Sequence, residues 1–368
     1  MTQLRRYPCV VMRGGTSRGL FFRASDLPAD PQERDAVIFG AFGSPDPRQI
    51  DGLGGADVLT SKVAIIGPPS RPDADVDYTF GQVGIDERTI DYSLNCGNIS
   101  AGVGVYAIQE GFVEAREPVT TVRVLNTNTG KVLRLQVPVA NGTPSVDGDF
   151  AIAGVPGTGA EIRLDLSDTV GAMTGRLLPT GEPLDEVWVD ALGKTIEVSI
   201  VDVANAAVFF RASDIGLTGN EEPAAFTADV LNRYTAIQQV AAKLSGMDDS
   251  DSFPRPVAVA EPRSFRDYMT GEVIAAADVD LLGRRVILPP PRLHKAFAAT
   301  GAVCTGVAAR LPGTVVHAVT RPPTDGIVRI GHPTGVFPVR VSVTDGQVTE
   351  ASFSRTARRI MDGTVYVR

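Results

Sequence analysis

The chain repeats one apolar segment about halfway along its length, and this repeat limits the folds that it can adopt. Residues 20–26 (LFFRASD) return almost unchanged as residues 208–214 (VFFRASD) in a chain of 368 residues. Each copy is an apolar run that ends in Ser-Asp, a pattern typical of a buried strand followed by a turn or a helix cap. We therefore expect two homologous halves of similar fold.

Two fainter echoes follow in the same order along the chain. The matched stretches are residues 62–66 (KVAII) with 256–260 (PVAVA), and residues 95–104 with 302–309. The first match places Lys62 opposite Pro256, and the second places Cys96 opposite Cys304. Two duplicated halves that had gathered insertions would keep this order, so the echoes support a duplication.

The rest of the chain is expected to be rich in strands. It holds 38 Gly and 26 Pro, while aromatic residues make up only 6%, which favours many short strands joined by turns. We predict a helix over residues 98–110, its counterpart over residues 305–310, and a hairpin from residues 120–125 and 131–137. Each half then becomes a strand-rich domain that wraps on one central helix, which is an α+β arrangement.

The best candidate for a linker is the Gly-, Pro- and Thr-containing stretch at residues 178–183 (LPTGEP). It predicts an N-terminal domain over residues 1–182 and a C-terminal domain over residues 183–368, with the option that the last strand returns to the first domain. A length of 368 residues suits two domains of ordinary size.

Composition and charge exclude several classes of function. The formal charge of −8, from 35 basic and 43 acidic residues, argues against nucleic acid and anionic membranes as partners. No apolar run approaches the roughly 18 residues of a membrane span, and the first residues lack an apolar signal core, so we expect a cytoplasmic protein. The three Cys and three His fit no metal-ligand spacing, so we predict no metal site.

Cys96 is the first candidate for chemistry, because it stands at the expected start of a helix lined by Gly and Ala. A helix N-terminus favours a thiolate and presents backbone N–H groups to a bound anion, so the pKa of the thiol should fall there. The flanking Asn95, Gly97 and Asn98 are unusual choices for a core and favour this interpretation over a merely buried thiol. Cys304 has weaker surroundings, and both acid–base chemistry and packing stay open for it.

Lys62 is the second candidate, because it follows a glycine-containing loop and opens the apolar run at residues 63–66. If the ammonium group is held against that run, desolvation lowers its pKa and makes a neutral amine available as a base. The alternative is a solvated lysine at the end of a strand. Because the echo places Pro256 opposite, only the first half would carry the amine.

Residues 12–19 (MRGGTSRG) form the third candidate, with uncovered backbone N–H groups, two hydroxyls and two guanidiniums. Such a loop can hold a carboxylate, although an ordinary glycine turn fits the segment equally well. It lacks the spacing of a phosphate-binding loop or of a dinucleotide fingerprint. The loop at residues 331–335 (GHPTG) contains His332, to which the sequence alone assigns no catalytic role.

Together these segments resemble a family of cofactor-free double-bond isomerases that includes 2-methylaconitate cis-trans isomerase, 3-methylitaconate isomerase and 4-oxalomesaconate tautomerase. The motifs appear in order from about residue 8 to the C-terminus: MRGGTS at 12–17, GSPDP at 43–47, DGLGG at 51–55, TSK at 60–62, NCGN at 95–98 and GHPTG at 331–335. The resemblance implies the diaminopimelate epimerase-like fold, with two similar domains, each a curved, barrel-like and mostly antiparallel sheet around a central helix. It also implies an active site in the cleft between them.

The resemblance further implies that Lys62 and Cys96 handle the proton, while Ser17 and nearby loop N–H groups hold the carboxylates of the substrate. The expected substrate-binding residues are Arg13, Gly14, Gly15, Thr16, Ser17, Gly54, Gly55, Ser61, Asn95, Gly97, Asn98, Cys304, Thr305 and His332. Two positions depart from the pattern. Arg18 stands where the family more often has lysine, and Cys304 is similar to the second thiol of the epimerases.

We therefore expect an isomerase that catalyses a 1,3-allylic proton shift in a small unsaturated di- or tricarboxylate, without metal, flavin or pyridoxal phosphate. Residues 47–52 (PRQIDG) favour 4-oxalomesaconate, with 2-methylaconitate and 3-methylitaconate as further candidates. Two alternatives stay open: a two-thiol racemase or epimerase that uses Cys96 with Cys304, and a non-catalytic carboxylate-binding accessory protein. A homodimer is a further option that the sequence leaves open.

Overall fold

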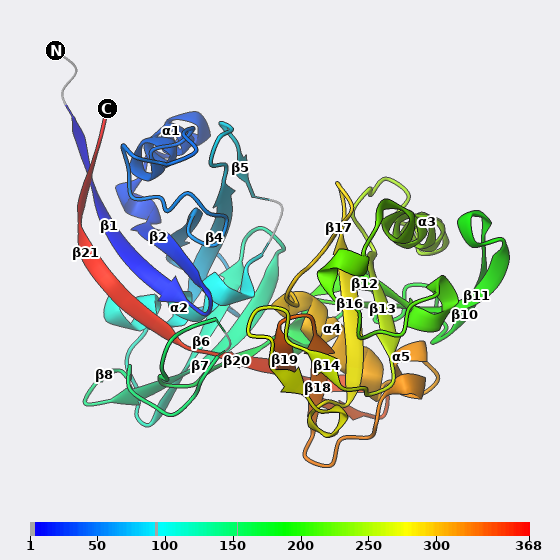
Figure 1. Ribbon diagram of the computed structural model, residues 1–368. Helices are drawn as coiled ribbons and strands as arrows, with labels where there is room; N and C mark the ends of the chain where they lie inside the picture. Colours follow the sequence, from blue (N-terminus) through cyan, green and yellow to red (C-terminus); the bar gives the residue numbers. More distant parts are fainter. Residues whose placement is uncertain (1–3, 93–94, 153) are drawn as a thin grey trace. The chain divides into compact units, whose positions relative to one another are not determined.

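The computed structural model describes residues 4–92, 95–152 and 154–368, and the chain forms two compact units (Figure 1). The first unit comprises Met1–Leu164 and Ser354–Arg368, and the second comprises Asp165–Phe353. The chain thus leaves the first unit at residue 164, and the expected linker at residues 178–183 lies inside the second unit. The division therefore differs from the boundary expected near residue 182, and the last strand belongs to the first unit.

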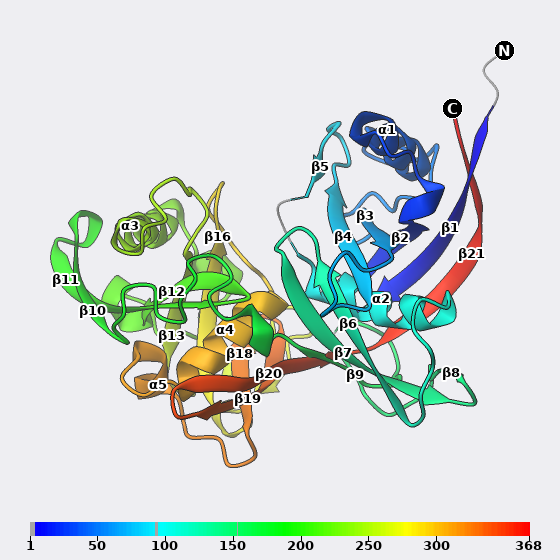
Figure 2. The same cartoon turned by 180° about the vertical axis from the view of Figure 1, so that it is seen from behind.

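The first unit is a strongly bent sheet with one buried helix. Its strands are β1 (Arg5–Gly14), β2 (Ser17–Arg23), β3 (Lys62–Gly67), β4 (Val76–Val83), β5 (Ile90–Asp91), β6 (Val119–Asn126), β7 (Lys131–Ala140), β8 (Thr143–Pro144) and β21 (Ala357–Val367), and its helices are α1 (Pro31–Phe42) and α2 (Gly97–Gln109). β1 pairs antiparallel with both β2 and β21, so the first and last strands lie side by side, as both ribbon views show (Figure 2). β2 is parallel to β3, and β6 and β7 form the predicted hairpin.

Helix α2 occupies the centre of this unit. Residues 99–108 of the helix are all buried, and they pack against strands β1, β3, β7 and β21. Small residues let the strands approach closely, because a Cβ on Gly104 would lie 2.9 Å from Val137. The helix begins at Gly97 and ends at Gln109, within one residue of the predicted span. α1 covers another part of the sheet, where Val37, Ile38 and Phe42 join the core.

The second unit repeats this arrangement. Its strands are β10 (Asp185–Val189), β11 (Lys194–Val203), β12 (Asn205–Arg211), β13 (Arg255–Ala260), β14 (Phe265–Arg266), β15 (Val273–Ile274), β16 (Leu281–Ile287), β17 (Arg292–Leu293), β18 (Ile327–His332) and β19 (Gly335–Thr344), and its helices are α3 (Ala228–Leu244), α4 (Ala299–Arg310) and α5 (Val315–Val319). The strands β9 (Ile162–Asp165) and β20 (Gln347–Arg355) carry the chain across the boundary. α4 is the buried central helix and begins six residues before its predicted start at residue 305. Two similar units, each a mostly antiparallel sheet around a central helix, confirm the predicted fold class.

Sheet register corrects one of the echoes between the two halves. β2 is parallel to β3 with Leu20 opposite Val63, and β12 is parallel to β13 with Val208 opposite Pro256. Since Leu20 and Val208 are the matched residues of the repeat, Val63 corresponds to Pro256. The counterpart of Lys62 is then Arg255, and the prediction that placed Pro256 there is wrong by one residue.

Helix packing corrects the echo that paired the two cysteines. Gly104 of α2 faces Leu135 and Val137 on the hairpin strand β7, and Gly306 of α4 faces Val339 and Val341 on β19. These two glycines occupy equivalent places, so the cap residue Cys96 corresponds to the cap residue Ala298. Cys304 corresponds to a glycine in the middle of α2, and its prediction as the partner position of Cys96 is wrong. No helix in the described part of the chain is long and apolar enough to cross a membrane.

Candidate active site

The N-terminus of α2 is the place where most of the predicted site residues meet. Cys96 is the N-cap of the helix, and its side chain caps no backbone N–H group. The β1–β2 loop lies directly against this end of the helix. A Cβ on Gly14 would lie 2.3 Å from the carbonyl oxygen of Asn98, and Gly15 has φ +50°, so both positions require glycine. The loop therefore approaches the first turn of α2 as closely as the backbone permits.

Hydrogen bonds fix the loop in this position. The Arg13 guanidinium donates from Nη1 to the carbonyl oxygens of Gly15 and Thr356, both at 2.9 Å. Asn98 donates from Nδ2 to Thr16 Oγ1 at 3.0 Å. Burial, and secondarily the neighbouring Arg358, lower the pKa of Arg13. Arg13 and Thr16 were both predicted to bind substrate. In the structure these polar atoms form hydrogen bonds that hold the loop in place.

Lys62 and Cys96 form the central pair of the site. The Nζ atom of Lys62 lies 3.5 Å from the Sγ atom of Cys96. Lys62 begins strand β3, is only 9% exposed, and its Nζ lies 5.6 Å from the centroid of the Phe80 ring. The amine is therefore withdrawn from bulk water and held against an aromatic face and a thiol. From the sequence, the amine was expected to lie against the apolar run at residues 63–66; its neighbours in the structure are Phe80 and Cys96.

Ser17 adds an unused hydroxyl to the same loop. It begins β2 opposite Gly14 and is 1% exposed. Its Oγ atom is buried and has no hydrogen-bond partner among the described residues. Buried polar atoms without partners are rare in folded proteins, so this hydroxyl is available for a ligand.

Arg355 is a member of the site that the sequence analysis missed. It ends β20, far along the chain, and donates from Nε to Asn98 Oδ1 at 2.9 Å. Burial lowers the pKa of its guanidinium to about 10, and the Cys96 thiol acts in the opposite direction. The side chain thus adds a positive charge beside the start of α2. Nothing in the local sequence marks it, because the return of the chain to the first unit brings it there.

The loop that leads to Lys62 is organised around Gln49, a second residue that the sequence analysis missed. Gln49 Oε1 accepts hydrogen bonds from the Ala56 N–H at 2.8 Å and from Ser61 Oγ at 3.0 Å. A Cβ on Gly54 would lie 2.1 Å from this oxygen, and one on Gly55 would lie 2.3 Å from a Thr60 hydroxyl. Ser61, Gly54 and Gly55, predicted to contact substrate, are seen here to build the loop.

The remaining predicted members of the first-unit site complete the helix start. Asn95 accepts a hydrogen bond from Ser100 Oγ at 3.2 Å through its Oδ1 atom. Gly97 is the first residue of α2. Both residues therefore flank Cys96 in the chain, Asn95 as part of the first-turn hydrogen bonding and Gly97 as the first helical residue.

Three predicted residues lie in the second unit. Cys304 is fully buried inside α4, its Sγ lies 3.3 Å from the carbonyl oxygen of Val201, and burial raises its pKa to about 12. Thr305 is also buried and donates to the Gly301 carbonyl at 2.8 Å. Both side chains are buried in the core, which disagrees with their prediction as substrate-binding residues. His332 ends β18, and its Nδ1 lies 3.3 Å from the Thr334 nitrogen.

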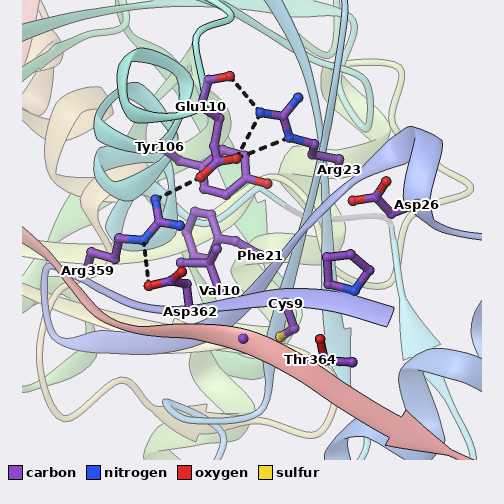
Figure 3. Close-up of a pocket in the computed structure, with 12 residues that line it drawn as sticks. Cys9, Val10, Phe21, Arg23, Asp26, Tyr106, Glu110, Arg359, Asp362 and Thr364 are labelled. Atoms are coloured by element: carbon purple, nitrogen blue, oxygen red, sulfur yellow. Dashed lines mark hydrogen bonds and ion pairs between the residues drawn. The ribbon is translucent and has the colours of Figure 1, made fainter. Parts of the chain in front are cut away.

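A separate cavity of about 340 Å³ opens in the first unit between β1, α2 and β21 (Figure 3). Three of its charged side chains pair with one another, since Glu110 accepts from Arg23 at 2.9 Å and from Arg359 at 2.8 Å. Cys9 also lines it, and burial raises the pKa of that thiol to about 12. Neither Lys62 nor Cys96 lines this cavity, so it is distinct from the Lys62–Cys96 site. Among the described residues, no three Cys, His, Asp or Glu side chains gather as a metal site would require.

Comparison with known proteins adds the family context. A family model described as PrpF protein matches residues 4–368. The 3-methylitaconate isomerase of Eubacterium barkeri is 51% identical, and the match covers 100% of this chain and 98% of the relative. The (4E)-oxalomesaconate Delta-isomerase of Novosphingobium sp. (strain KA1) is 39% identical, with 98% of this chain and 97% of the relative covered.

Solved structures agree with these matches. A crystal structure of methylitaconate-delta-isomerase matches with a TM-score of 0.92 and 50% identity, covering 100% of this chain and 96% of that one. A hydroxyproline epimerase from Agrobacterium vitis matches with a TM-score of 0.55 at 11% identity, covering 100% of this chain and 93% of that one. The second likeness concerns the fold alone, and it agrees with the epimerase-like architecture predicted from the sequence.

Proposed function

The chain belongs to the PrpF protein family and is an isomerase, and from this premise we propose that it catalyses a 1,3-allylic proton shift in an unsaturated di- or tricarboxylate. One observation carries the proposal: the Lys62 amine lies 3.5 Å from the Cys96 thiol, at the uncapped N-terminus of a buried helix. An acid–base pair beside an anion-binding helix end is what a proton shift in a carboxylate requires.

The reaction moves one proton and one double bond, without net loss or gain of atoms. A base removes a proton from the carbon next to the double bond, and the C–H electron pair forms a new C=C bond. The former π electrons take up a proton two carbons away. Lys62 is the base in this scheme, because its amine is buried and shielded by Phe80. Cys96 assists the return of the proton or orients the substrate.

Negative charge on the substrate is met by the surroundings of this pair. The first-turn N–H groups of α2 and the uncommitted Ser17 hydroxyl can bind carboxylate oxygens, and Arg355 adds a positive charge. The same groups stabilise the dienolate that forms when the proton leaves. The scheme requires no metal, flavin or pyridoxal phosphate.

The substrate that we favour is a dicarboxylate of the methylitaconate type. Identity is 51% with the Eubacterium barkeri enzyme but 39% with the oxalomesaconate isomerase. This difference reverses the order of preference reached from residues 47–52, which pointed to 4-oxalomesaconate. A panel of 3-methylitaconate, 4-oxalomesaconate and 2-methylaconitate, followed by ultraviolet absorbance, decides between them, because moving a double bond into or out of conjugation changes the spectrum.

The test of the mechanism is the variant Lys62→Met, assayed in deuterated water. We expect the rate and the incorporation of deuterium at carbon to fall together by about 10²–10⁴-fold, the usual contribution of a general base. The matched control is Lys243→Met, which removes an exposed lysine of α3 in the second unit and should keep the rate. A Lys62→Met protein that keeps most of its rate removes lysine from the mechanism.

The same variants address the alternatives. A two-thiol racemase needs a reactive Cys304, but this thiol is buried within α4 and donates a hydrogen bond to the Val201 carbonyl oxygen. A non-catalytic carboxylate-binding protein would show no isomerisation in wild type or in Lys62→Met, and only its affinity for the carboxylate could change. The homodimer and the cytoplasmic location remain predictions from the sequence.

A further inference from the structure

We propose that the second unit carries its own carboxylate-binding site at the N-terminus of α4, with Arg285 as the principal ligand. The proposal concerns residues that the sequence analysis did not single out, and it deepens the proposed function by assigning the second unit a role in recognising a carboxylate. It does not depend on Lys62 being the base.

Arg285 is a buried guanidinium without enough partners. It lies on β16 and is 5% exposed. Its Nε and Nη1 atoms are buried and have no hydrogen-bond partner among the described residues. A guanidinium carries five N–H donors and stays charged at neutral pH. Two buried nitrogens without hydrogen-bond partners therefore favour the binding of an anion.

The guanidinium lies against the first turn of α4. A Cβ on Gly301, the third residue of this 12-residue helix, would lie 2.7 Å from Arg285 Nη1 and 3.1 Å from its Cζ. Glycine at this position therefore makes room for the arginine. The N-cap residue Ala298 has no side chain that could cap the first N–H groups of the helix. Arg285 and an uncapped helix end thus stand together.

Two further side chains add to the cluster. Arg255 lies near Arg285, and burial followed by this neighbour lowers the pKa of Arg285 to about 10. His294 has a buried Nδ1 atom without a partner among the described residues. Burial, and then Arg285, lower the pKa of His294 to about 4, so its ring is neutral at pH 7 and its nitrogens can share a hydrogen bond with a ligand.

Within the described part of the chain, no acidic side chain forms an ion pair with Arg285 or Arg255. Arg255 donates instead to the carbonyl of Leu288. The nearby Cys304 thiol is neutral at pH 7, because burial raises its pKa to about 12. Asp202, which also affects Cys304, accepts through Oδ2 from the backbone N–H groups of residues 173 and 174, and its buried Oδ1 has no hydrogen-bond partner among the described residues.

The chemistry of these groups selects a carboxylate. The planar fork of a guanidinium matches the two oxygens of a carboxylate, and helix N–H groups bind the same kind of anion. The carboxylate can belong to the substrate of the isomerase or to a separate small acid. Both sources present the same group to Arg285, and inhibition kinetics separate them.

The experiment measures binding of fumarate by titration calorimetry to wild type, Arg285→Met and Arg285→Lys. Fumarate is a dicarboxylate that carries no allylic proton, so its binding is independent of turnover. We expect Arg285→Met to weaken the affinity by about tenfold or more, the effect of losing a charge-assisted hydrogen bond, and Arg285→Lys to recover part of it. Arg310→Met, at the opposite end of α4, is the matched control and should bind as wild type does.

Kinetics then identify the source of the carboxylate. Competitive inhibition by fumarate together with a raised KM and a nearly unchanged kcat in Arg285→Met assigns the site to the substrate itself. Noncompetitive inhibition that disappears in the same variant assigns it to a separate acid. Either result supports the site.

Unchanged fumarate affinity in Arg285→Met overturns the proposal. If that variant does not fold, Gly301→Ala replaces it, because the added methyl group would crowd Nη1 and should weaken binding to a similar degree. Repeating the titration in Lys62→Met separates the two ideas. Failure of the proposed function leaves the Arg285 effect intact, and failure of this site leaves the effect of Lys62→Met on rate intact.

Discussion

Strands β3 and β13 occupy equivalent positions in the two units, each parallel to the strand that carries the repeated segment. The first residue of β3 is Lys62, and the first residue of β13 is Arg255. At the cap of the central helix the first unit has Cys96, and the second has Ala298. An amine and a thiol in the first unit thus correspond to a permanent cation and a methyl group in the second. Both units keep the same scaffold, while the two groups that we propose to transfer protons occur in the first unit and not at the corresponding positions of the second.

The contact between the hairpin loop and the central helix shows which features are structural. In the first unit Asn98 of the helix donates to Thr16 of the loop, and in the second Asn205 at the start of β12 donates to Thr300 of the helix, each at 3.0 Å. The amide and hydroxyl have exchanged sides. A polar bridge at this point is therefore part of the scaffold in both units, whereas Lys62 and Cys96 have no equivalent in the second unit.

The largest effect is expected when Lys62, at the start of β3, is replaced by arginine, the residue at the start of β13 in the second unit. Lys62→Arg places a permanent cation at this position and removes a group that can lose its proton, so kcat/KM should fall by about 10²–10⁴-fold while the protein stays folded. Steady-state rates and circular dichroism measure the two properties. The control Lys243→Arg changes an exposed side chain and should leave the rate unaltered. An active Lys62→Arg enzyme would mean that the charge and not the proton transfer matters.

The next effect distinguishes the thiols of the two units. Burial raises the pKa of Cys9 and Cys304 to about 12, so at pH 8 only about one molecule in ten thousand carries either as a thiolate. Cys96 is partly exposed at a helix N-terminus. Iodoacetamide should therefore modify one thiol in the native protein, and all three after denaturation, as mass spectrometry of peptides would show.

The variant Cys96→Ser provides the control for this experiment, because it should abolish labelling of the native protein. Raising the pH to 9 should leave Cys304 unlabelled, since its thiol remains protonated and buried. Labelling of Cys304 at a rate close to that of Cys96 would break the contrast between the units and revive the two-thiol alternative.

Much of this contrast was accessible from the sequence, and the errors have physical causes. The repeat, the strand-rich architecture and the helix after Cys96 follow from local patterns, whereas the joint role of Lys62 and Cys96 was implied by the resemblance to the isomerase family. Pro256 was wrongly matched to Lys62 because the two segments were aligned by residue type alone. The true correspondence depends on the register of the sheet, which hydrogen bonds between strands determine. The pairing of Cys304 with Cys96 failed because small residues line both the start and the middle of each helix.

Other parts of the site depend on contacts between distant segments. Arg355 reaches Asn98 only because the last strands return to the first unit. Gln49 was missed because its role is to bind a neighbouring loop, for which a glutamine in a turn gives no signal. Arg285 lies next to Gly301 through the packing of β16 on α4, and neither residue type alone indicates a ligand.

The smallest effect concerns glycines, which the two units use differently. Gly14→Ala would place a methyl group 2.3 Å from a backbone carbonyl of α2, so the loop or the helix must shift, at a cost of about 1–3 kcal/mol in the free energy of unfolding. In the second unit, the nearest atoms to the methyl group of Gly306→Ala are side-chain atoms of Val339 and Val341 at 3.1–3.2 Å. Helix propensity offsets that strain, so stability should change by less than about 1 kcal/mol. Urea unfolding measures both. Equal losses would show that the close approach of the loop to the helix is not the constraint that sets the first unit apart.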